Sequence, residues 1–452
     1  MTDVVSAVTI EQALDRLRHG SLTSVQLTRE CLETIARLNP ALNAFITVTA
    51  DQALEAARRA DQARSRGEWL GPLHGIPVSL KDLIDQRGVP TTAGSRALDS
   101  TAKTADAPVT AALRSAGAVL VGKCNLHEFA FGTTSDESAY GPVRHPQDPS
   151  RSPGGSSGGS AVAVATGMSL ASIGTDTGGS IRIPAAACGV VGLKAGAGEI
   201  PCEGVVPLSR SLDHVGPLCR TIADAAIVYG ALTGTPPVTI AASPASLRLG
   251  TPQGFLRDRL QTQVQQRFAD ACARLSEAGA VIETIEIPEL EQAAAAYLAI
   301  VLPEAAEWHA AALNRRPDRY CPGVRIRLEA GRYVLAEDYV RGQLVRERLR
   351  AAVDTALSAC DAIILPSLAV TATEVGAGLV SVASHQEPVR GAMLRLTQPF
   401  NMSGHPAISI PCGTAADGFP CGLQLVGRRG GTQALIAVAL GCEPHATRGG
   451  TG

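Results

Sequence analysis

The pattern of apolar and polar positions divides the chain near residue 71. Residues 8–66 place apolar side chains at helical spacing with Ser or Gly at the segment ends, which predicts a group of N-terminal helices. Beyond Gly71, the run GIPVSLKDLI predicts a strand that carries Lys81. The helical stretch APVTAALRSAG and the apolar run AVLVGKCNL follow it. Strand, helix and strand in this order predict a parallel sheet.

The alternation of strands and helices continues through the rest of the chain. The runs SLRLGT, AVIETIEI, DAIILPS and AISIPCG predict strands, separated by the long helical stretches LQTQVQQRFADACARLSEAG and AEDYVRGQLVRERLRAAVDTALSA. Segment 371–385 has small residues without a clear period, which is typical of a mobile loop over a site. We expect N-terminal helices over 1–70, a main domain over 71–443 and a frayed tail over 444–452.

Charge and composition restrict the class of protein. The 452 residues include 40 basic and 42 acidic side chains, and no run rich in Lys or Arg stands out that would neutralise a row of phosphates. Nucleic acid and anionic membrane surfaces are therefore not expected partners. The N-terminus lacks the pattern of a secretory signal, and no window is apolar enough to span a membrane, so we predict a cytoplasmic enzyme. The 11 cysteines include no C-x-x-C pair and the nine histidines no H-E-x-x-H, so neither a metal nor a cofactor is expected.

A Gly-rich loop, GTDTGGS at 174–180, is the first candidate for chemistry. Its small residues leave the N–H groups of Thr177, Gly178 and Gly179 free to converge on one point, as an oxyanion hole requires. Ser180 ends this loop and is a candidate nucleophile. Asp176 and Arg182 flank it and are interpreted as a brace for the loop, although an isolated surface pair fits them equally. For the loop taken alone, the alternative is a simple chain turn.

Lys81 is the candidate base. Only four lysines occur in the chain, and this one lies on a mostly apolar strand, where burial lowers the pKa of an ammonium group and leaves a neutral amine. The alternative is an ordinary ion pair of Lys81 with Asp82 or Asp85 at the strand end.

A second Ser-containing loop, PGGSSGG, presents Ser156 and Ser157. It matches G-x-S-x-G, the nucleophile elbow of α/β-hydrolases, but that elbow follows a strand, and the preceding HPQDPSRSP is too rich in proline and polar residues to be one. A phosphate-binding loop is also excluded, because Ser160 and Ala161 stand where Lys and Ser or Thr are required.

At these residues the sequence resembles the amidase signature family. The stretches SPGGSSGGSAVAVATG and IGTDTGGSIRIPAAACGVVGLK are similar to its defining segment, and VSLKDLI is similar to its lysine segment. The likeness extends from about residue 10 to 443, although AGAGEIPCEG after VVGLK departs from the usual pattern. With the predicted elements, it implies an α/β fold: a single large domain with a central twisted mixed β-sheet, helices on both faces and a helical N-terminal entry.

The resemblance also assigns roles to particular residues. It implies Ser180 as nucleophile, Ser156 as a bridging serine on a cis peptide bond, and Lys81 as base. We expect Ser157 to hydrogen-bond Lys81 and orient it. The substrate pocket is expected around 129–134 and 371–385, and the residues expected to line it are Phe131, Gly132 and Thr133.

The main prediction is therefore an amidase that hydrolyses a small-molecule carboxamide to the acid and ammonia or amine. The alternative is the glutamine-hydrolysing subunit of a tRNA-dependent amidotransferase complex. In such subunits the resemblance implies an acidic residue shortly before the N-x-x-G segment, and none stands between Arg390 and Asn401. The expected partner is a small amide, with a homodimer left open.

Overall fold

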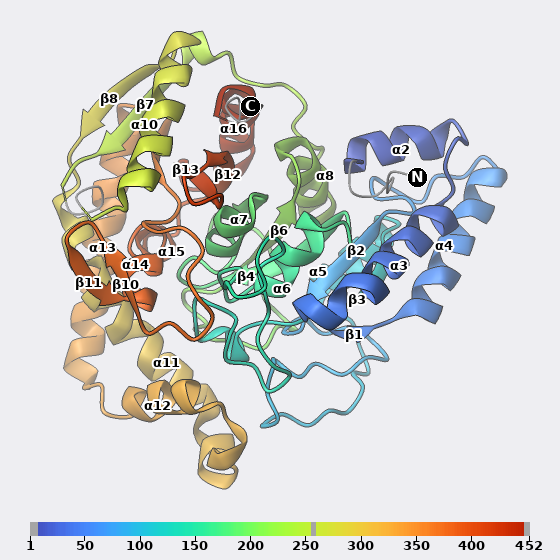
Figure 1. Cartoon of the computed structure of the whole chain (residues 1–452), viewed down its shortest axis with the longest axis horizontal. Coiled ribbons are helices and arrows are strands. Elements are labelled where there is room, and N and C mark those ends of the chain that lie inside the picture. Colours follow the sequence, from blue (N-terminus) through green and yellow to red (C-terminus); the bar gives the residue numbers. More distant parts are fainter. Residues whose placement is uncertain (1–7, 255–258, 447–452) are drawn as a thin grey trace.

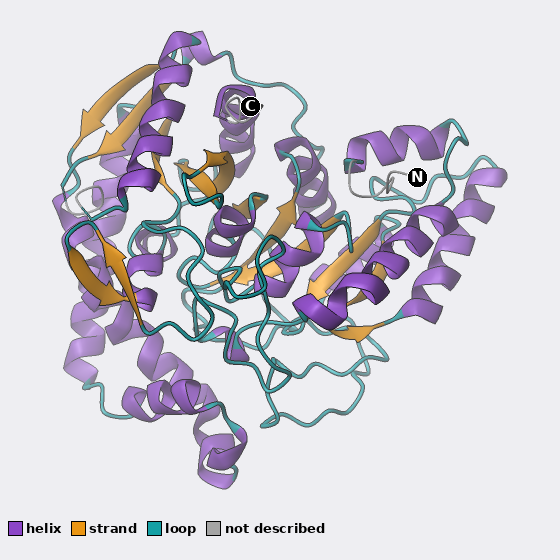
Figure 2. Cartoon of the chain, viewed as in Figure 1, coloured by secondary structure: helices purple, strands orange, loops and turns teal. Residues whose placement is uncertain are grey.

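The computed structural model describes residues 8–254 and 259–446. Eleven strands form one mixed sheet (Figures 1 and 2). In order across this sheet they are β1 (Phe45–Val48), β3 (Val119–Cys124), β2 (Pro77–Lys81), β4 (Ala171–Asp176), β6 (His214–Cys219), β5 (Val191–Lys194), β12 (Ala407–Thr414), β13 (Pro420–Val426), β9 (Ala362–Pro366), β7 (Arg248–Pro252) and β8 (Val281–Ile285).

Parallel and antiparallel pairs form separate groups along the sheet. Strand β2 runs parallel to β3 and β4, as the sequence predicts for the first pair, and β7 runs parallel to β8 and β9. Between these groups the pairs β4–β6, β6–β5, β5–β12, β12–β13 and β13–β9 are antiparallel. The expected single α/β domain with a mixed sheet is therefore confirmed.

Helices cover both faces of the sheet. They are α2 (Ile10–Arg18), α3 (Ser24–Leu42), α4 (Ala50–Ser65), α5 (Pro108–Ser115), α6 (Gly158–Ala165), α7 (Arg182–Cys188), α8 (Ile222–Thr233), α10 (Thr262–Glu277), α11 (Ala293–Arg315), α12 (Pro322–Gly331), α13 (Ala336–Ser358), α14 (Val389–Leu394), α15 (Gln398–Ser403) and α16 (Thr432–Ala446). The 3₁₀ helices in the described part of the chain are η1 (Glu128–Ala130), η2 (Pro244–Ser246), η3 (Pro288–Gln292) and η4 (Pro317–Arg319).

Alternating strand residues supply separate cores on the two faces. In β9, Ala362 and Ile364 pack in the cluster that contains α5, α8, α10 and α16, while Ile363 and Leu365 pack in the cluster that contains α11 and α13.

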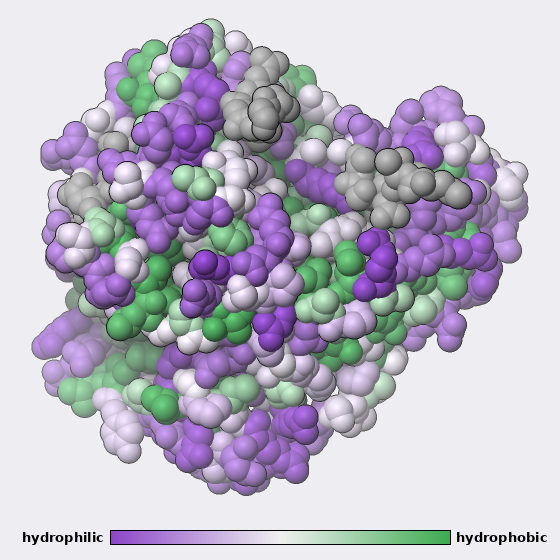
Figure 3. Space-filling model, viewed as in Figure 1, coloured by the Kyte–Doolittle hydropathy of each residue, from purple (hydrophilic) through white to green (hydrophobic). Residues whose placement is uncertain are grey.

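The face in Figure 3 is covered largely by hydrophilic residues, with hydrophobic residues in smaller groups. Among the described residues, no helix has the length and apolar character needed to cross a bilayer.

Three segments differ from the sequence expectation. Within the predicted N-terminal helical region, Phe45–Val48 forms the edge strand β1, which pairs with β3. The second part of the expected loop at 371–385 contains strand residues, because β10 (Leu379–Val382) pairs with β11 (His385–Pro388) and buries Val382. Helix α16 continues to Ala446, and the rest of the expected tail, 447–452, lies outside the described residues.

Candidate active site

The candidate residues meet where two neighbouring strands end. Lys81 is the last residue of β2 and Asp176 the last of β4, and the two strands are parallel neighbours, so both ends lie at the same edge of the sheet. The loop that carries Ser156 precedes α6, and the loop that carries Ser180 precedes α7. Helix α6 packs on β2, β3 and β4, and this brings its preceding loop to that edge.

Lys81 is fully buried and hydrogen-bonded to hydroxyl groups. Its Nζ lies 2.7 Å from Ser156 Oγ and 2.7 Å from Thr175 Oγ1. Burial lowers the pKa of Lys81 to about 7, although Asp176 and Asp213 act to raise it. A large fraction of this amine is therefore neutral at neutral pH.

Lys81 does not form the alternative ion pair with Asp82 or Asp85, because other lysines pair with both carboxylates. Asp82 pairs with Lys123 at 2.8 Å, with both side chains fully buried. Asp85 pairs with Lys103 at 3.3 Å.

The Ser156 loop has the cis Gly155–Ser156 peptide bond that the resemblance implies. The carbonyl oxygen of Ser156 accepts hydrogen bonds at 3.1 Å from the main-chain N–H of His127 and from Ser135 Oγ. The following turn permits no larger residue, since a Cβ at Gly159 would lie 2.3 Å from the carbonyl oxygen of Asn125. The loop is thus held by hydrogen bonds at Ser156 and by close packing at Gly159.

Ser157 does not have the contact expected of it. Among the described residues Lys81 hydrogen-bonds Ser156 and Thr175, while Ser157 Oγ donates to the carbonyl oxygen of Thr175 at 3.1 Å. The main-chain N–H of Ser157 donates to the carbonyl oxygen of Ser180, also at 3.1 Å. Ser157 therefore joins the two serine loops and supports Lys81 only through Thr175.

The loop 176–180 directs its carbonyl groups away from the centre. The carbonyl oxygens accept hydrogen bonds as follows: Asp176 from Asn401 Nδ2 at 2.8 Å, Gly178 from Thr397 Oγ1 at 2.6 Å, Gly179 from the N–H of Ile183 at 2.7 Å, and Ser180 from the N–H of Ser157. In contrast, within residues 8–254 and 259–446 the N–H groups of Thr177, Gly178, Gly179 and Ser180 donate to nothing. Four buried donors are left for a ligand, as an oxyanion hole requires.

Both glycines of this loop are required by close packing. Gly179 has φ +144°, and a Cβ there would lie 2.2 Å from Thr397 Oγ1. At Gly178 a Cβ would lie 2.6 Å from the hydroxyl of Tyr297.

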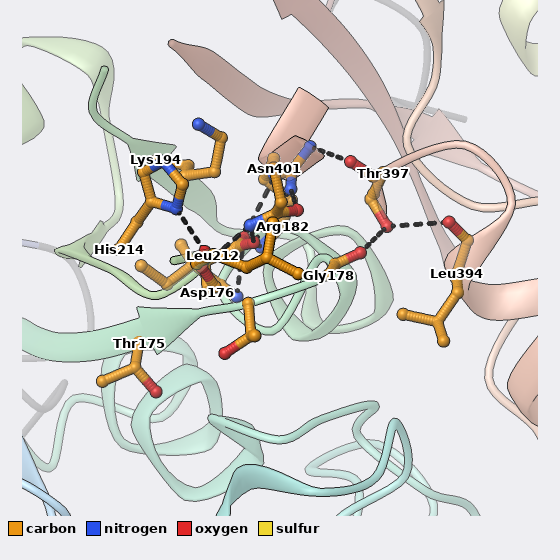
Figure 4. A network of polar contacts seen from close by, with 12 residues as sticks. Thr175, Asp176, Gly178, Arg182, Lys194, Leu212, His214, Leu394, Thr397 and Asn401 are labelled. Carbon is orange, nitrogen blue, oxygen red and sulfur yellow. Dashed lines mark hydrogen bonds and ion pairs between the residues drawn. The ribbon is translucent and has the colours of Figure 1, made fainter. Parts of the chain in front are cut away.

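Asp176 and Arg182 form a fully buried ion pair at the base of the loop, not a surface pair (Figure 4). Arg182 donates to Asp176 through Nε at 3.0 Å and Nη2 at 2.8 Å, and its other N–H groups reach Thr397 O, Asn401 Oδ1 and Gln424 Oε1. Burial disfavours the charged form of Asp176, yet the guanidinium of Arg182 holds the pKa of this carboxyl below its usual range. The predicted brace is thus built from β4, α7, α15 and β13.

Asp213 is a site residue without a signal in the sequence. It accepts a hydrogen bond from Thr177 Oγ1 at 2.6 Å, and burial raises its pKa to about 6. It stands in an irregular stretch before β6, without a motif. Thr175, Thr397 and Asn401 were also not assigned, although each lies inside or next to a segment that carries the family resemblance.

Two of the three expected pocket residues line a cavity, whereas Phe131 is fully buried and is not part of its lining. Gly132 and Thr133 line a cavity of about 460 Å³, together with 375–378 from the segment expected to cover the site. The ring of Phe131 lies under the guanidinium groups of Arg327 and Arg390, at 5.6 and 5.2 Å. Gly132 is required because a Cβ there would collide with the ring of His127 at 2.1 Å.

A sequence model of the family described as Amidase matches residues 26–436. The chain belongs to the amidase family. It is 36% identical to a glutamyl-tRNA(Gln) amidotransferase subunit of Chloroflexus aurantiacus, over 93% of each chain. A crystal structure of an amidase matches with a TM-score of 0.93 and 38% identity, over 97% of this chain and 100% of that one. The structure of the corresponding amidotransferase subunit from Thermotoga maritima matches with a TM-score of 0.79 and 33% identity, over 98% and 95%.

The family resemblance drawn from the sequence is confirmed, and this amidase acts on C–N bonds as an amidohydrolase. The curated relatives count against the expectation of a lone enzyme without a nucleic-acid partner. Their name is that of a subunit and includes a transfer RNA. They support the stated alternative more directly than the small-molecule prediction. Within the described residues, no group of three or more His, Cys, Asp or Glu could hold a metal ion.

Asp176→Asn tests the brace. Loss of one partner leaves Arg182 charged and buried, so we expect the free energy of unfolding to fall by about 3–5 kcal/mol. Urea unfolding measures the change. The control is Glu283→Gln in the exposed pair with Arg248, which should cost no more than about 1 kcal/mol. Equal effects of the two substitutions would contradict a structural role for the buried pair.

Proposed function

We propose that this amidase hydrolyses a primary carboxamide to the carboxylic acid and ammonia through an acyl-enzyme on Ser180. The observation that carries the proposal is the buried Lys81–Ser156 hydrogen bond of 2.7 Å beside a loop whose N–H groups have no partner among the described residues. A serine hydroxyl needs a base to become an effective nucleophile, and a neutral amine linked to a second hydroxyl supplies one.

The proposed proton relay runs through two serines. Neutral Lys81 takes the proton of Ser156, Ser156 takes that of Ser180, and Ser180 Oγ attacks the amide carbon. The N–H groups of the 177–180 loop stabilise the oxyanion, and one such donor is typically worth about 3 kcal/mol of barrier. The proton then returns along the relay to the departing nitrogen, the C–N bond breaks, and ammonia leaves. Water repeats the cycle on the ester and releases the acid.

The supporting residues keep this relay in place. Ser157 and Thr175 fix the Ser156 loop and Lys81 relative to each other. Asp176 and Arg182 hold the loop that supplies the oxyanion donors. Asp213 orients Thr177 within that loop.

Two substrate settings fit this chemistry. The curated relatives support the first, the glutamine-hydrolysing subunit of an amidotransferase complex, in which ammonia is passed on. The TM-score of 0.93 to an amidase, against 0.79 to an amidotransferase subunit, supports the second, a small-molecule amidase. The 390–401 segment also favours the second, because it presents Leu394, and no carboxylate, next to Gly178.

Ser180→Ala tests the nucleophile. We expect kcat to fall at least about 1,000-fold, because only oxyanion stabilisation and binding remain. Ammonia release from a panel of primary amides measures it. Ser160→Ala, a buried serine on α6 that the relay does not use, should retain activity. Full amide hydrolysis by Ser180→Ala would overturn the mechanism.

The pH dependence tests Lys81 as the base. Since the neutral amine is the active form and its pKa is about 7, kcat/KM should rise with pH and level off above about pH 8. Below about pH 6 it should fall roughly tenfold per pH unit. Asp213→Asn removes a charge that raises the pKa of Lys81, so the rise should move to lower pH. A flat profile would contradict this assignment.

A comparison of substrates separates the two settings. The purified chain alone is given glutamine, simple primary amides and anilides, and ammonia or amine release is recorded. A small-molecule amidase hydrolyses its amide without other proteins. The subunit of an amidotransferase releases ammonia from glutamine only when partner proteins and transfer RNA are added. If no ammonia or amine is released from any of these substrates, with or without the partner proteins and transfer RNA, the proposed function is contradicted.

A further inference from the structure

The cavity of about 460 Å³ beside the site contains two arginines. Its lining includes Gly132, Thr133 and 375–378, together with Arg327 and Arg390. Cavities of this size accept small organic ligands.

Hydrogen bonds connect this cavity to the serine loop. Ser135, two residues beyond the lining residue Thr133, donates through Oγ to the carbonyl oxygen of Ser156 at 3.1 Å. The N–H of Ser152 donates to the carbonyl oxygen of Thr373 at 2.8 Å, which ties the covering segment to the same loop. The segments that line the cavity are therefore hydrogen-bonded to the loop that carries Ser156.

One of the two arginines is already neutralised. Arg327 Nη2 lies 2.8 Å from Glu137 Oε2, and Glu137 also accepts from the N–H of Gly323 at 2.9 Å. His127 shares this carboxylate at 3.2 Å, and burial lowers the pKa of His127, which disfavours the charged ring. Asp136, the other lining carboxylate, accepts from Thr134 Oγ1 and from the N–H of Gly376.

Arg390 has no such partner. It donates to the carbonyl oxygen of Phe131 at 3.1 Å and lies over the Phe131 ring, but among the described residues it forms no ion pair with a carboxylate. Burial lowers its pKa to about 10, which leaves it charged at neutral pH. A guanidinium that is half-buried without a counter-ion is unfavourable, and a carboxylate of matching geometry relieves that cost.

We propose that Arg390 binds a carboxylate of the substrate, so that the preferred substrates are primary amides that carry a carboxylate elsewhere in the molecule. This inference rests on the proposed amide hydrolysis and holds for either setting, since glutamine and the monoamides of dicarboxylic acids both belong to this class. The guanidinium fixes the anionic end of the substrate while the amide carbon faces Ser180.

The experiment compares a charged amide with its neutral counterpart. Succinamate and glutaramate are each paired with the corresponding diamide, succinamide or glutaramide, and kcat/KM is measured for both members of a pair. We expect the wild-type enzyme to prefer at least one anionic member about 10- to 100-fold, the range for hydrogen bonds to charged groups. In Arg390→Met the ratio should fall close to one, mainly through KM of the anionic amide.

Two further variants make the result specific. Arg390→Lys keeps the charge without the planar fork and should retain part of the preference. Arg325→Met is the matched control, because Arg325 lies on the same helix as Arg327 but is exposed and paired with Glu329. It should leave the ratio unchanged. If Arg390→Met does not fold, the wild-type ratio and Arg390→Lys still decide the question.

The outcomes separate this inference from the proposed function. Two outcomes overturn the role of Arg390 and leave amide hydrolysis standing. The first is hydrolysis by the wild-type enzyme without preference for the anionic amides. The second is a loss of activity in Arg390→Met and Arg390→Lys that is equal for the anionic amide and its diamide. Calorimetry with succinate and glutarate gives a readout that needs no turnover. Binding that Arg390→Met abolishes, in a protein that hydrolyses neither these amides nor, with partner proteins and transfer RNA added, glutamine, supports the anion site and overturns the proposed function.

Discussion

The buried ion pair of Asp176 and Arg182 is the interaction on which the rest of the site depends. A charge without water is tolerated only when its hydrogen bonds are made, and the five N–H groups of a guanidinium are difficult to satisfy. Here each has an acceptor, from Asp176, Thr397, Asn401 or Gln424. The pair therefore fixes the end of β4, the start of α7, the helix α15 and the strand β13 relative to one another.

That arrangement decides which way the intervening loop faces. With both ends of the loop held and its carbonyl oxygens bound by Thr397, Asn401 and Ser157, the N–H groups are directed to the other side. Packing against Thr397 and Tyr297 also explains why the loop contains Gly178 and Gly179, since a Cβ would collide at either position. The free donors are thus a consequence of the brace and the close packing, not of glycine flexibility alone.

The sequence predicted the centre of this site better than its surroundings. Motif residues such as Lys81 and Ser156 were identifiable because local sequence carries their chemistry, and the structure brings them within 2.7 Å. Asp213 was not, because its role arises only when the turn before β6 reaches Thr177. Strand β6 itself was missed: its Gly and Pro argue against a central strand, yet Pro217 pairs opposite Ile173 within the sheet. Pairing with distant segments overrode local propensity there.

The contrast among the buried lysines explains why Lys81 is suited to be the base. Lys123 contacts the carboxylate of Asp82 and forms an ion pair. Lys194 has a pKa well below the ordinary value because of burial, but it donates to the carbonyl oxygens of Ala195 and His405, which have no proton to give. Lys81 combines a pKa lowered from 10.5 to about 7, roughly 5 kcal/mol against the charged form, with hydroxyl neighbours that can pass a proton. Burial alone makes an amine neutral; the hydroxyl contacts are what would let that neutral amine act on a nucleophile.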